Sequence, residues 1–261
     1  YHVNPRLLAL WRRTERLEPD LASVVAGNHT FDDERFIRLR HEVPASAMDG
    51  RWFPYEKGGS YQPFYSPTEL LVNWGDDGRE MRENQISRYG TDAQVIQSIK
   101  WWFNPGFSYP RISSIGFGVR VLAEGQMFSE KGMCVFPQRM EFALGLLAIL
   151  CSSWSEDLLC AFGRHRAYEN SAVGNLPITN DDGFGGGDRL AKIAGACVEL
   201  MFDAESAIET SPQFALPQSI RMWQQGSSRE VSLLFVDRFH TGLRTRLKAL
   251  YAELVQRQVS L

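Results

Sequence analysis

Cysteine is scarce in this chain, and histidine follows no metal-binding pattern. The four cysteines lie far apart in apolar surroundings and form no Cys-x-x-Cys pair, so we expect reduced core thiols rather than a disulfide framework or a zinc site. The five histidines show no ligand spacing either. The sequence therefore predicts no metal site. The four cysteines are Cys134, Cys151, Cys160 and Cys197.

The chain also lacks a strong net charge and a long apolar run. The chain has 28 Lys and Arg residues and 31 Asp and Glu residues, which gives a formal net charge of -3. Any nucleic-acid contact must therefore come from a local basic surface. The most apolar stretch, 142–151, is about half the length of a bilayer-spanning helix and predicts a core helix. Without an initiator Met or an export signal, we expect an excised part of a cytoplasmic protein with no membrane partner.

Motifs of several enzyme classes are missing. The chain has no Gly-x-Ser-x-Gly nucleophile elbow, and the glycine-rich stretch 183–187 is followed by an aspartate where a P-loop needs a lysine. The carboxylates of Asp32, Asp33 and Glu34 could bind Mg²⁺, but no lysine partner follows on a later strand, so we interpret them as the cap of a short helix. We therefore expect no complete active site in these residues.

Short strand-like runs separated by Gly, Pro and Asp clusters occupy residues 27–137 and predict a sheet-rich body. Residues 69–74 predict a strand that stops at the Gly-Asp-Asp-Gly of 75–78. Residues 116–122 alternate like a half-buried strand, and 133–136 predict another. The predicted fold class is α/β in the broad sense (α+β), with a mixed or antiparallel sheet followed by C-terminal helices.

Apolar residues at helical spacing mark the two ends of the chain. Asn4 and Pro5 predict the start of a short opening helix. Residues 140–150 and 188–201 predict helices, and apolar residues over 236–254 form a seam that would pack against a partner helix. We therefore expect a helical lead-in (1–26), a central domain (27–216) and a C-terminal helical segment (217–261).

Aromatic, basic and glycine residues are mixed between positions 51 and 114. Gly58 and Gly59 would let the backbone approach a phosphate closely, and Lys57 supplies a point charge. The same composition also suits a buried aromatic cluster with a Gly-Gly turn. The residues alone leave both interpretations open.

Four segments of this chain resemble, in order and spacing, the carboxy-terminal half of the large BREX-type and type IIG adenine methyltransferases. Each segment alone is weak evidence for the resemblance, but the occurrence of all four in this order is uncommon. Two later segments, 173–178 and 208–214, resemble that family's closing strand and the lead into its final helices, so the resemblance covers nearly the whole chain. The four segments are Asp32–Arg38 (DDERFIR), Trp52–Gly59 (WFPYEKGG), Val72–Gly78 (VNWGDDG) and Gly106–Ser114 (GFSYPRISS).

Three positions depart from the family pattern. Phe31 and Asp33 stand where the family has Gly and Asn in Gly-Asp-Asn-Glu-Arg-Phe, and Pro110 stands where it has Ser between an aromatic residue and Arg. These departures bear on the local backbone and leave the resemblance intact.

The resemblance implies a division of labour within a longer protein. In this family the amino-terminal half is a Rossmann-like methyltransferase that uses S-adenosylmethionine, and the half resembled here chooses the DNA sequence. This chain has neither the Asn-Pro-Pro-Tyr motif that holds a flipped adenine nor the glycine-rich turn for the methyl donor: Asn104-Pro105 continues as Gly106-Phe107. We expect no catalysis and no cofactor in this chain, with S-adenosylmethionine bound by the missing domain.

On this interpretation the partners are double-stranded DNA, the missing methyltransferase domain and other subunits of a restriction-modification or phage-defence system. Base contacts would come from the polar loops 85–97 and 108–114. The expected phosphate contacts are Arg51, Lys57, Gly58, Gly59 and Arg111, and the possible base or loop contacts are Asn73, Ser113 and Ser114.

Two alternatives remain open at the level of the sequence. The chain could be a protein-interaction module that docks through its terminal helix, in which case the aromatic cluster is core. It could also be a Mg²⁺-dependent nuclease that uses Asp32, Asp33 and Glu34.

Overall fold

The computed structural model describes residues 14–48, 50–161, 167–178 and 187–214, together with Thr245 and Ala249. The opening helix predicted from Asn4 lies outside these residues, as does all of the predicted 236–254 helix apart from Thr245 and Ala249.

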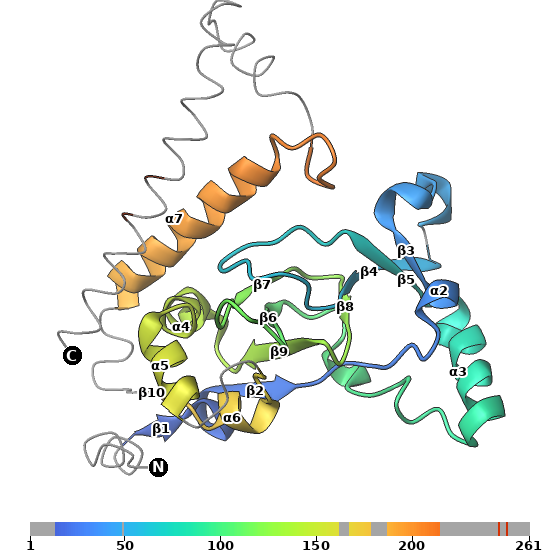
Figure 1. Cartoon of the computed structure of the whole chain (residues 1–261), viewed down its shortest axis with the longest axis horizontal. Coiled ribbons are helices and arrows are strands. Elements are labelled where there is room, and N and C mark those ends of the chain that lie inside the picture. The colour runs from blue at the N-terminus through green and yellow to red at the C-terminus, as the bar shows by residue number, and fades with distance from the viewer. Residues whose placement is uncertain are drawn as a thin grey trace, which may run out of the picture.

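Three sheets form the body of the described part (Figure 1). The central sheet is antiparallel, with the order β2 (Ala22–Val25), β9 (Gly132–Pro137), β6 (Gly106–Pro110) and β7 (Arg120–Leu122). The second sheet has the order β3 (Ile37–Leu39), β5 (Leu70–Asn73), β4 (Trp52–Glu56) and β8 (Met127–Phe128), with only the β4–β8 pair parallel. A small antiparallel pair joins β1 (Glu15–Arg16) to β10 (Pro177–Ile178). The predicted mixed or antiparallel sheet is confirmed.

Helices dominate after β9, and α7 packs along α4 (Figure 1). The α-helices are α2 (Asp33–Phe36), α3 (Gly75–Tyr89), α4 (Ala143–Leu150), α5 (Ser153–Ala161), α6 (Asn170–Gly174) and α7 (Gly187–Glu205). Short helical turns are η1 (Leu17–Leu21), η2 (Arg40–Glu42), η3 (Ala45–Ala47), η4 (Ile99–Trp101) and η5 (Met140–Phe142). The predicted helices over 140–150 and 188–201 are confirmed, and so is the α+β class with helices after the sheets.

Within the described residues no single helix is long and apolar enough to cross a membrane, although the bent pair Met140–Leu150 and Ser153–Ala161 meets the length and composition test when counted together.

Strand β9 supplies side chains to two separate cores. Met133 and Val135 belong to the core between the central sheet and the helices α4, α5 and α7. Cys134 and Phe136 point to the opposite side, where the second sheet and an aromatic cluster pack. Because both faces of β9 are buried, its sequence reads as a continuous apolar run without alternation.

The cysteines lie where the sequence predicts core thiols. Cys134, Cys151 and Cys197 are buried, Cys160 is half-buried, and all four are free. Burial raises the pKa of the Cys151 thiol to about 12, so this thiol stays protonated and unreactive at neutral pH.

The strand predicted over 116–122 is shorter than expected. Only β7 is a strand, and the burial alternation breaks at its start: Phe117, Val119, Arg120 and Leu122 are buried, whereas Val121 is partly exposed. Val121 does pack against the same core as Phe117 and Val119, as the pattern predicts. The strand is not half-buried, however, because Leu122 enters the second core and Arg120 is buried in an ion pair with Glu56.

The lead-in is also not helical throughout. Residues 22–25 form β2, whose Ala22 and Val24 enter the first core beside β9, so the expectation of a helix is wrong there. The strand predicted before residue 75 does end at Asn73, but the unpredicted helix α3 follows it. The domain boundaries at residues 26 and 216 stay predictions.

Candidate nucleic-acid interface

Two loops that carry most of the predicted site residues meet a third loop at one surface. The two are loop 57–62 after β4 and loop 111–118 between β6 and β7, and the third is loop 129–131 between β8 and β9. The Arg111 N–H donates to the Lys131 carbonyl at 2.9 Å. A Cβ atom on Gly58 would lie 2.5 Å from that same carbonyl oxygen, and one on Gly116 would lie 3.3 Å from the Tyr61 ring. The backbone of Lys131 thus joins the two predicted loops.

The two predicted cations at this surface each have a carboxylate partner. The Lys57 ammonium contacts Asp33, and its side chain is 15% exposed. Partial burial acts to raise the pKa of Asp33, but hydrogen bonds from Lys57 and Thr30 outweigh it and lower the pKa. The Arg111 guanidinium donates twice to Glu169 Oε1, at 3.2 Å from Nε and 2.9 Å from Nη2. A polyanion would have to compete with, or share, these pairs.

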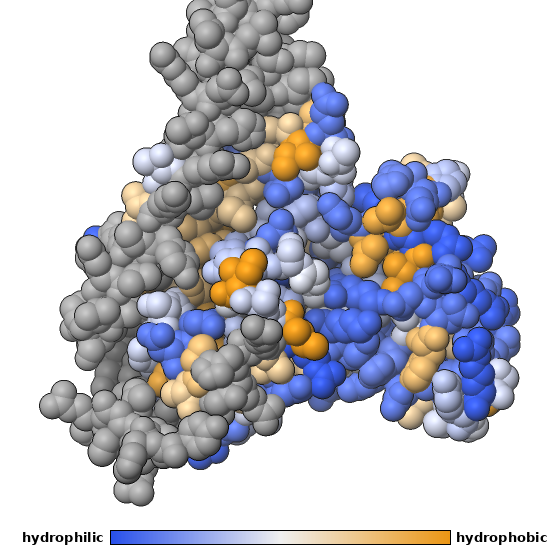
Figure 2. Space-filling view, viewed as in Figure 1, coloured by the Kyte–Doolittle hydropathy of each residue, from blue (hydrophilic) through white to orange (hydrophobic). Residues whose placement is uncertain are grey.

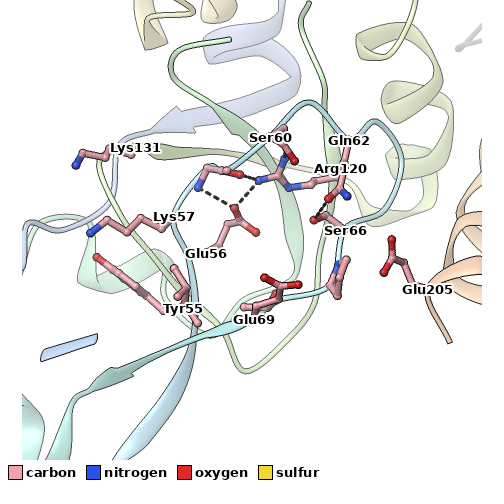
Figure 3. Close-up of a pocket in the computed structure, with 15 residues that line it drawn as sticks. Tyr55, Glu56, Lys57, Ser60, Gln62, Ser66, Glu69, Arg120, Lys131 and Glu205 are labelled. Atoms are coloured by element: carbon pink, nitrogen blue, oxygen red, sulfur yellow. Dashed lines mark hydrogen bonds and ion pairs between the residues drawn. The ribbon is translucent and has the colours of Figure 1, made fainter. Parts of the chain in front are cut away.

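Lys131 is a third cation, which the sequence reasoning missed. Its side chain is exposed, and within the described part of the chain its ammonium makes no ion pair within 4 Å. Figure 3 shows the ammonium groups of Lys57 and Lys131 pointing in the same direction. A single lysine in a short turn carries no sequence signal; the pairing of β6 with β9 is what brings it beside Arg111.

A buried ion pair holds the Gly58-Gly59 loop. Arg120 is 2% exposed, and its Nη2 lies 2.6 Å from Glu56 Oε1 (Figure 3). The guanidinium also donates to the Ser60 carbonyl at 3.3 Å and contacts the Gly58 carbonyl, while the Gly58 N–H donates to Glu56 at 2.9 Å. Loop 57–60 is therefore wrapped around Arg120. A phosphate at Gly58 would have to displace the Glu56 carboxylate from this N–H.

Gly58 and Gly59 both have a left-handed backbone. Their φ angles of +84° and +78° lie in a region that favours glycine. Only Gly58 is also closely packed, since a Cβ on Gly59 would meet nothing within 4 Å.

Arg51 and Asn73 do not join this surface. They lie at the other end of β4, where Trp52 pairs with Asn73. The Asn73 side chain is 7% exposed and accepts the Gly75 N–H at 3.2 Å, so it shapes the turn into α3. Arg51 lies 3.5 Å from Glu80.

The surface over α2 and α3 is mainly hydrophilic (Figure 2), but it is not a basic patch. Its arginines alternate with carboxylates, as in the Arg35–Glu80 contact at 3.8 Å and the Arg82–Asp92 contact at 2.7 Å. Local charge therefore does not mark this surface for a polyanion.

Ser113 and Ser114 lie in loop 111–118 with different surroundings. Ser113 is buried, and its hydroxyl oxygen accepts the N–H groups of Ile115 and Gly116, both at 3.3 Å. Ser114 is exposed. Ser113 thus shapes the loop, whereas Ser114 lies on its surface.

The acidic run near residue 32 caps a helix, as the sequence predicts. The Asp32 side chain accepts the Arg35 N–H at 3.2 Å at the start of α2, and Asp33 is engaged by Lys57 and Thr30. Across the described residues no group of three His, Cys, Asp or Glu side chains is arranged to hold a metal ion. The Asp32–Glu34 run therefore gives the nuclease alternative no support.

A cavity of about 350 Å³ opens behind loop 57–62. Figure 3 shows Glu69 and Glu205 lining it away from Lys57 and Lys131. Burial, and after it the nearby Glu69 carboxylate, raises the pKa of Glu205 at the end of α7. The carboxylates of Glu69 and Glu205 thus lie near each other in this cavity, where their negative charges repel.

We expect the Glu205→Gln variant to melt higher than the parent chain at pH 7. A raised folded-state pKa means that protonation of Glu205 adds stability at low pH, and that this contribution is lost as the pH rises through the folded-state pKa. Removing the charge should raise Tm by about 1–3 °C at pH 7 and have little effect near pH 4. Thermal unfolding at both pH values checks this, with exposed Glu199→Gln on the same helix as control; a lower Tm at pH 7 would contradict it.

Comparison with known proteins places this architecture. No protein-family model matches the chain. It is 26% identical over 191 residues to the adenine-specific methyltransferase PglX of Lacticaseibacillus casei (strain Zhang), a match that covers 66% of this chain and 16% of that protein. It is also 26% identical over 191 residues to the adenine-specific methyltransferase BrxX of Escherichia coli O9:H4 (strain HS), covering 69% of this chain and 14% of that protein. The chain thus matches about one-sixth of the first relative's length and about one-seventh of the second's.

The fold matches a solved structure as well. The Type IIL restriction-modification enzyme MmeI, determined in complex with DNA, superimposes with a TM-score of 0.51 at 13% identity, over 89% of this chain and 37% of that one. At this identity the match concerns the fold. The chain is therefore similar in sequence to adenine-specific methyltransferases and similar in fold to part of a restriction-modification enzyme.

Proposed function

We propose that this chain is the DNA target-recognition part of a site-specific adenine-N6 DNA methyltransferase that acts in restriction-modification or phage defence. The observation that carries the proposal is the meeting of Lys57, Arg111 and Lys131 on three adjoining loops, two of which lie in the segments that resemble the carboxy-terminal half of that family. The names of the relatives and the DNA bound in the MmeI structure support it.

In this proposal the cations position the duplex and the loop side chains read it. Contacts to phosphates fix register but carry no sequence information, whereas contacts to base edges select the site. Lys131 is exposed and available to a phosphate, and two hydrogen bonds to Glu169 Oε1 fix the Arg111 guanidinium beside it. Ser114, exposed on the neighbouring loop, is the predicted residue best placed to approach a base or sugar.

The catalytic step belongs to residues outside this chain. We propose that S-adenosylmethionine is bound by a methyltransferase domain elsewhere in the parent protein, and that this domain and other defence subunits are its protein partners. The cytoplasmic location stays a prediction. The docking alternative rests on the predicted helix over 236–254, and no described contact favours it over DNA.

Binding of the whole chain to a mixed-sequence duplex across a salt series tests the proposal. If phosphates are gripped by Lys57, Arg111 and Lys131, the logarithm of affinity should fall linearly with the logarithm of salt concentration, by about 0.9 per phosphate contact. Absence of binding at low salt, or binding that does not depend on salt, would contradict it.

We expect Lys131→Ala to weaken binding to all duplexes by several-fold and to make the salt slope less steep by about 1. The reason is that Lys131 is exposed and makes no ion pair among the described residues, so its loss removes a phosphate contact without freeing a carboxylate. Lys100→Ala is the matched control, since Lys100 is an exposed lysine that lies on η4 and outside the three loops. Equal slopes for the Lys131 variant and the parent chain would exclude this role.

A further inference from the structure

Loop 111–118 presents two isoleucines to solvent. Ile112 is 71% exposed and Ile115 is 74% exposed, the highest values among the large apolar side chains that the structure describes. A single exposed apolar residue is ordinary, but two within four residues of one loop form a concentrated apolar tip. We call these two side chains, with Ser113 and Ser114 between them, the isoleucine tip.

The isoleucine tip is rigidly mounted on its first side. Arg111 is fixed by two backbone hydrogen bonds, from its N–H to the Lys131 carbonyl at 2.9 Å and to its carbonyl from the Tyr168 N–H at 2.8 Å. Ile112 also forms an antiparallel bridge with Ala167. The turn itself is closed by the buried Ser113 hydroxyl.

The second side is anchored in the core. The Phe117 ring packs against Tyr109 and Tyr168, with ring centroids 5.1 Å and 5.0 Å away. The Phe117 N–H donates to Glu156, which also accepts the Tyr168 hydroxyl at 2.9 Å. These hydrogen bonds and ring contacts fix the loop backbone on both sides of the two isoleucines. Binding of a partner at the isoleucine tip would therefore cost little conformational entropy.

The surroundings of the tip favour duplex DNA as the occupant over an apolar protein groove. Arg111 directly precedes it, Lys131 is hydrogen-bonded to Arg111 through its backbone, and the exposed Ser114 separates the two isoleucines. DNA-bending proteins use the same combination: basic side chains contact the DNA backbone, and a rigidly held apolar side chain inserts between neighbouring base pairs.

We propose that the isoleucine tip is a wedge that enters a groove of duplex DNA and unstacks one base step beside the phosphates held by Arg111 and Lys131. This inference rests on the proposed function and adds a physical role for apolar residues that phosphate contacts do not supply. Unstacking costs free energy in a paired duplex and almost none at a step that is already disrupted. A wedge therefore makes the protein prefer a disrupted step.

The test compares two probes: a mixed-sequence duplex and the same duplex with one central abasic nucleotide. We expect the parent chain to bind the abasic duplex about tenfold more tightly, which corresponds to about 1.4 kcal/mol. The Ile112→Ala/Ile115→Ala variant should lose this preference while keeping the salt slope. The matched control is Ile86→Ala/Ile99→Ala, which removes two isoleucines that are 48% and 47% exposed outside the loop; it should keep the preference.

Each other outcome counts against the wedge. Equal preference in the parent chain and the Ile112/Ile115 variant would overturn it while leaving the proposed function intact, because salt-dependent binding would persist. Self-association of the parent chain that disappears in this variant would assign the tip to a protein contact instead. No binding to either duplex at low salt would overturn both the proposed function and the wedge.

Discussion

The Glu56→Ala variant is expected to lose about 3–5 kcal/mol of unfolding free energy. Arg120 and Glu56 are 2% and 7% exposed, and removal of the carboxylate would leave a buried guanidinium without its charge partner. The Gly58 N–H would lose its acceptor at the same time. Arg120 Nε already has no hydrogen-bond partner among the described residues, so no spare acceptor compensates. Urea unfolding of the parent chain and the variant measures the difference.

The Glu56→Ala/Arg120→Met double variant is the control for this prediction. Replacing both ions by apolar groups removes the unpaired charge, so the double variant should be clearly more stable than Glu56→Ala alone. A loss below about 1 kcal/mol in the single variant would show that the buried pair is not what holds loop 57–60.

The second large effect is expected at adjacent glycines. Gly58→Ala should cost about 2–4 kcal/mol, because alanine is strained at a φ of +84° and its Cβ would lie 2.5 Å from the Lys131 carbonyl oxygen. Gly59→Ala should cost about 1 kcal/mol, because its φ of +78° brings the same strain but no atom lies within 4 Å. The two variants differ only in packing.

DNA binding should separate the same two variants. Gly58→Ala forces loop 57–62 away from loop 129–131 and should weaken duplex binding together with stability, whereas Gly59→Ala should bind nearly as the parent chain does. Urea unfolding and a duplex titration on both variants provide the measurement. Similar behaviour of the two would mean that the Gly58–Lys131 contact does not organise the surface.

Elements that bury a continuous apolar side were predictable from the sequence. The runs that become β5, β9 and α4 are buried along most of their length, and α7 carries apolar residues at helical spacing. In β5, β9 and α4 the signal is an unbroken apolar run of limited length bounded by turn residues, whereas in α7 it is the helical spacing itself.

Helix α3 shows why other elements were missed. Its first residues, Asp76, Asp77 and Gly78, have left-handed φ angles of 51°, 56° and 69°, and the helix then buries few side chains, among them Met81 and Gln85. With so small an apolar side, residues 79–89 carry no helical periodicity, and the Gly-Asp-Asp-Gly signal indicates only a turn. Tertiary contacts such as Gln85 with the Val95 N–H decide its place.

The sequence predicted which segments form the candidate site, but not the long-range contacts that join them. The sequence indicated loop 57–62 and residues 111–114, which the fold does bring together. Lys131 and Arg120 were missed because their importance comes from long-range pairing: β6 with β9 for Lys131, and a buried ion pair across 64 residues for Arg120. Arg51 and Asn73 were grouped with the site by sequence proximity, although β4 separates them from it.

Selection of the whole chain on a pool of randomised DNA duplexes tests the central claim most directly. Because the proposal is that this chain chooses the DNA sequence, repeated rounds of binding at moderate salt should enrich one short adenine-containing sequence. Lys131→Ala should bind more weakly yet enrich the same sequence, since a phosphate contact carries no sequence information. Salt-dependent binding that enriches no sequence, or no binding at all, would contradict target recognition by this chain.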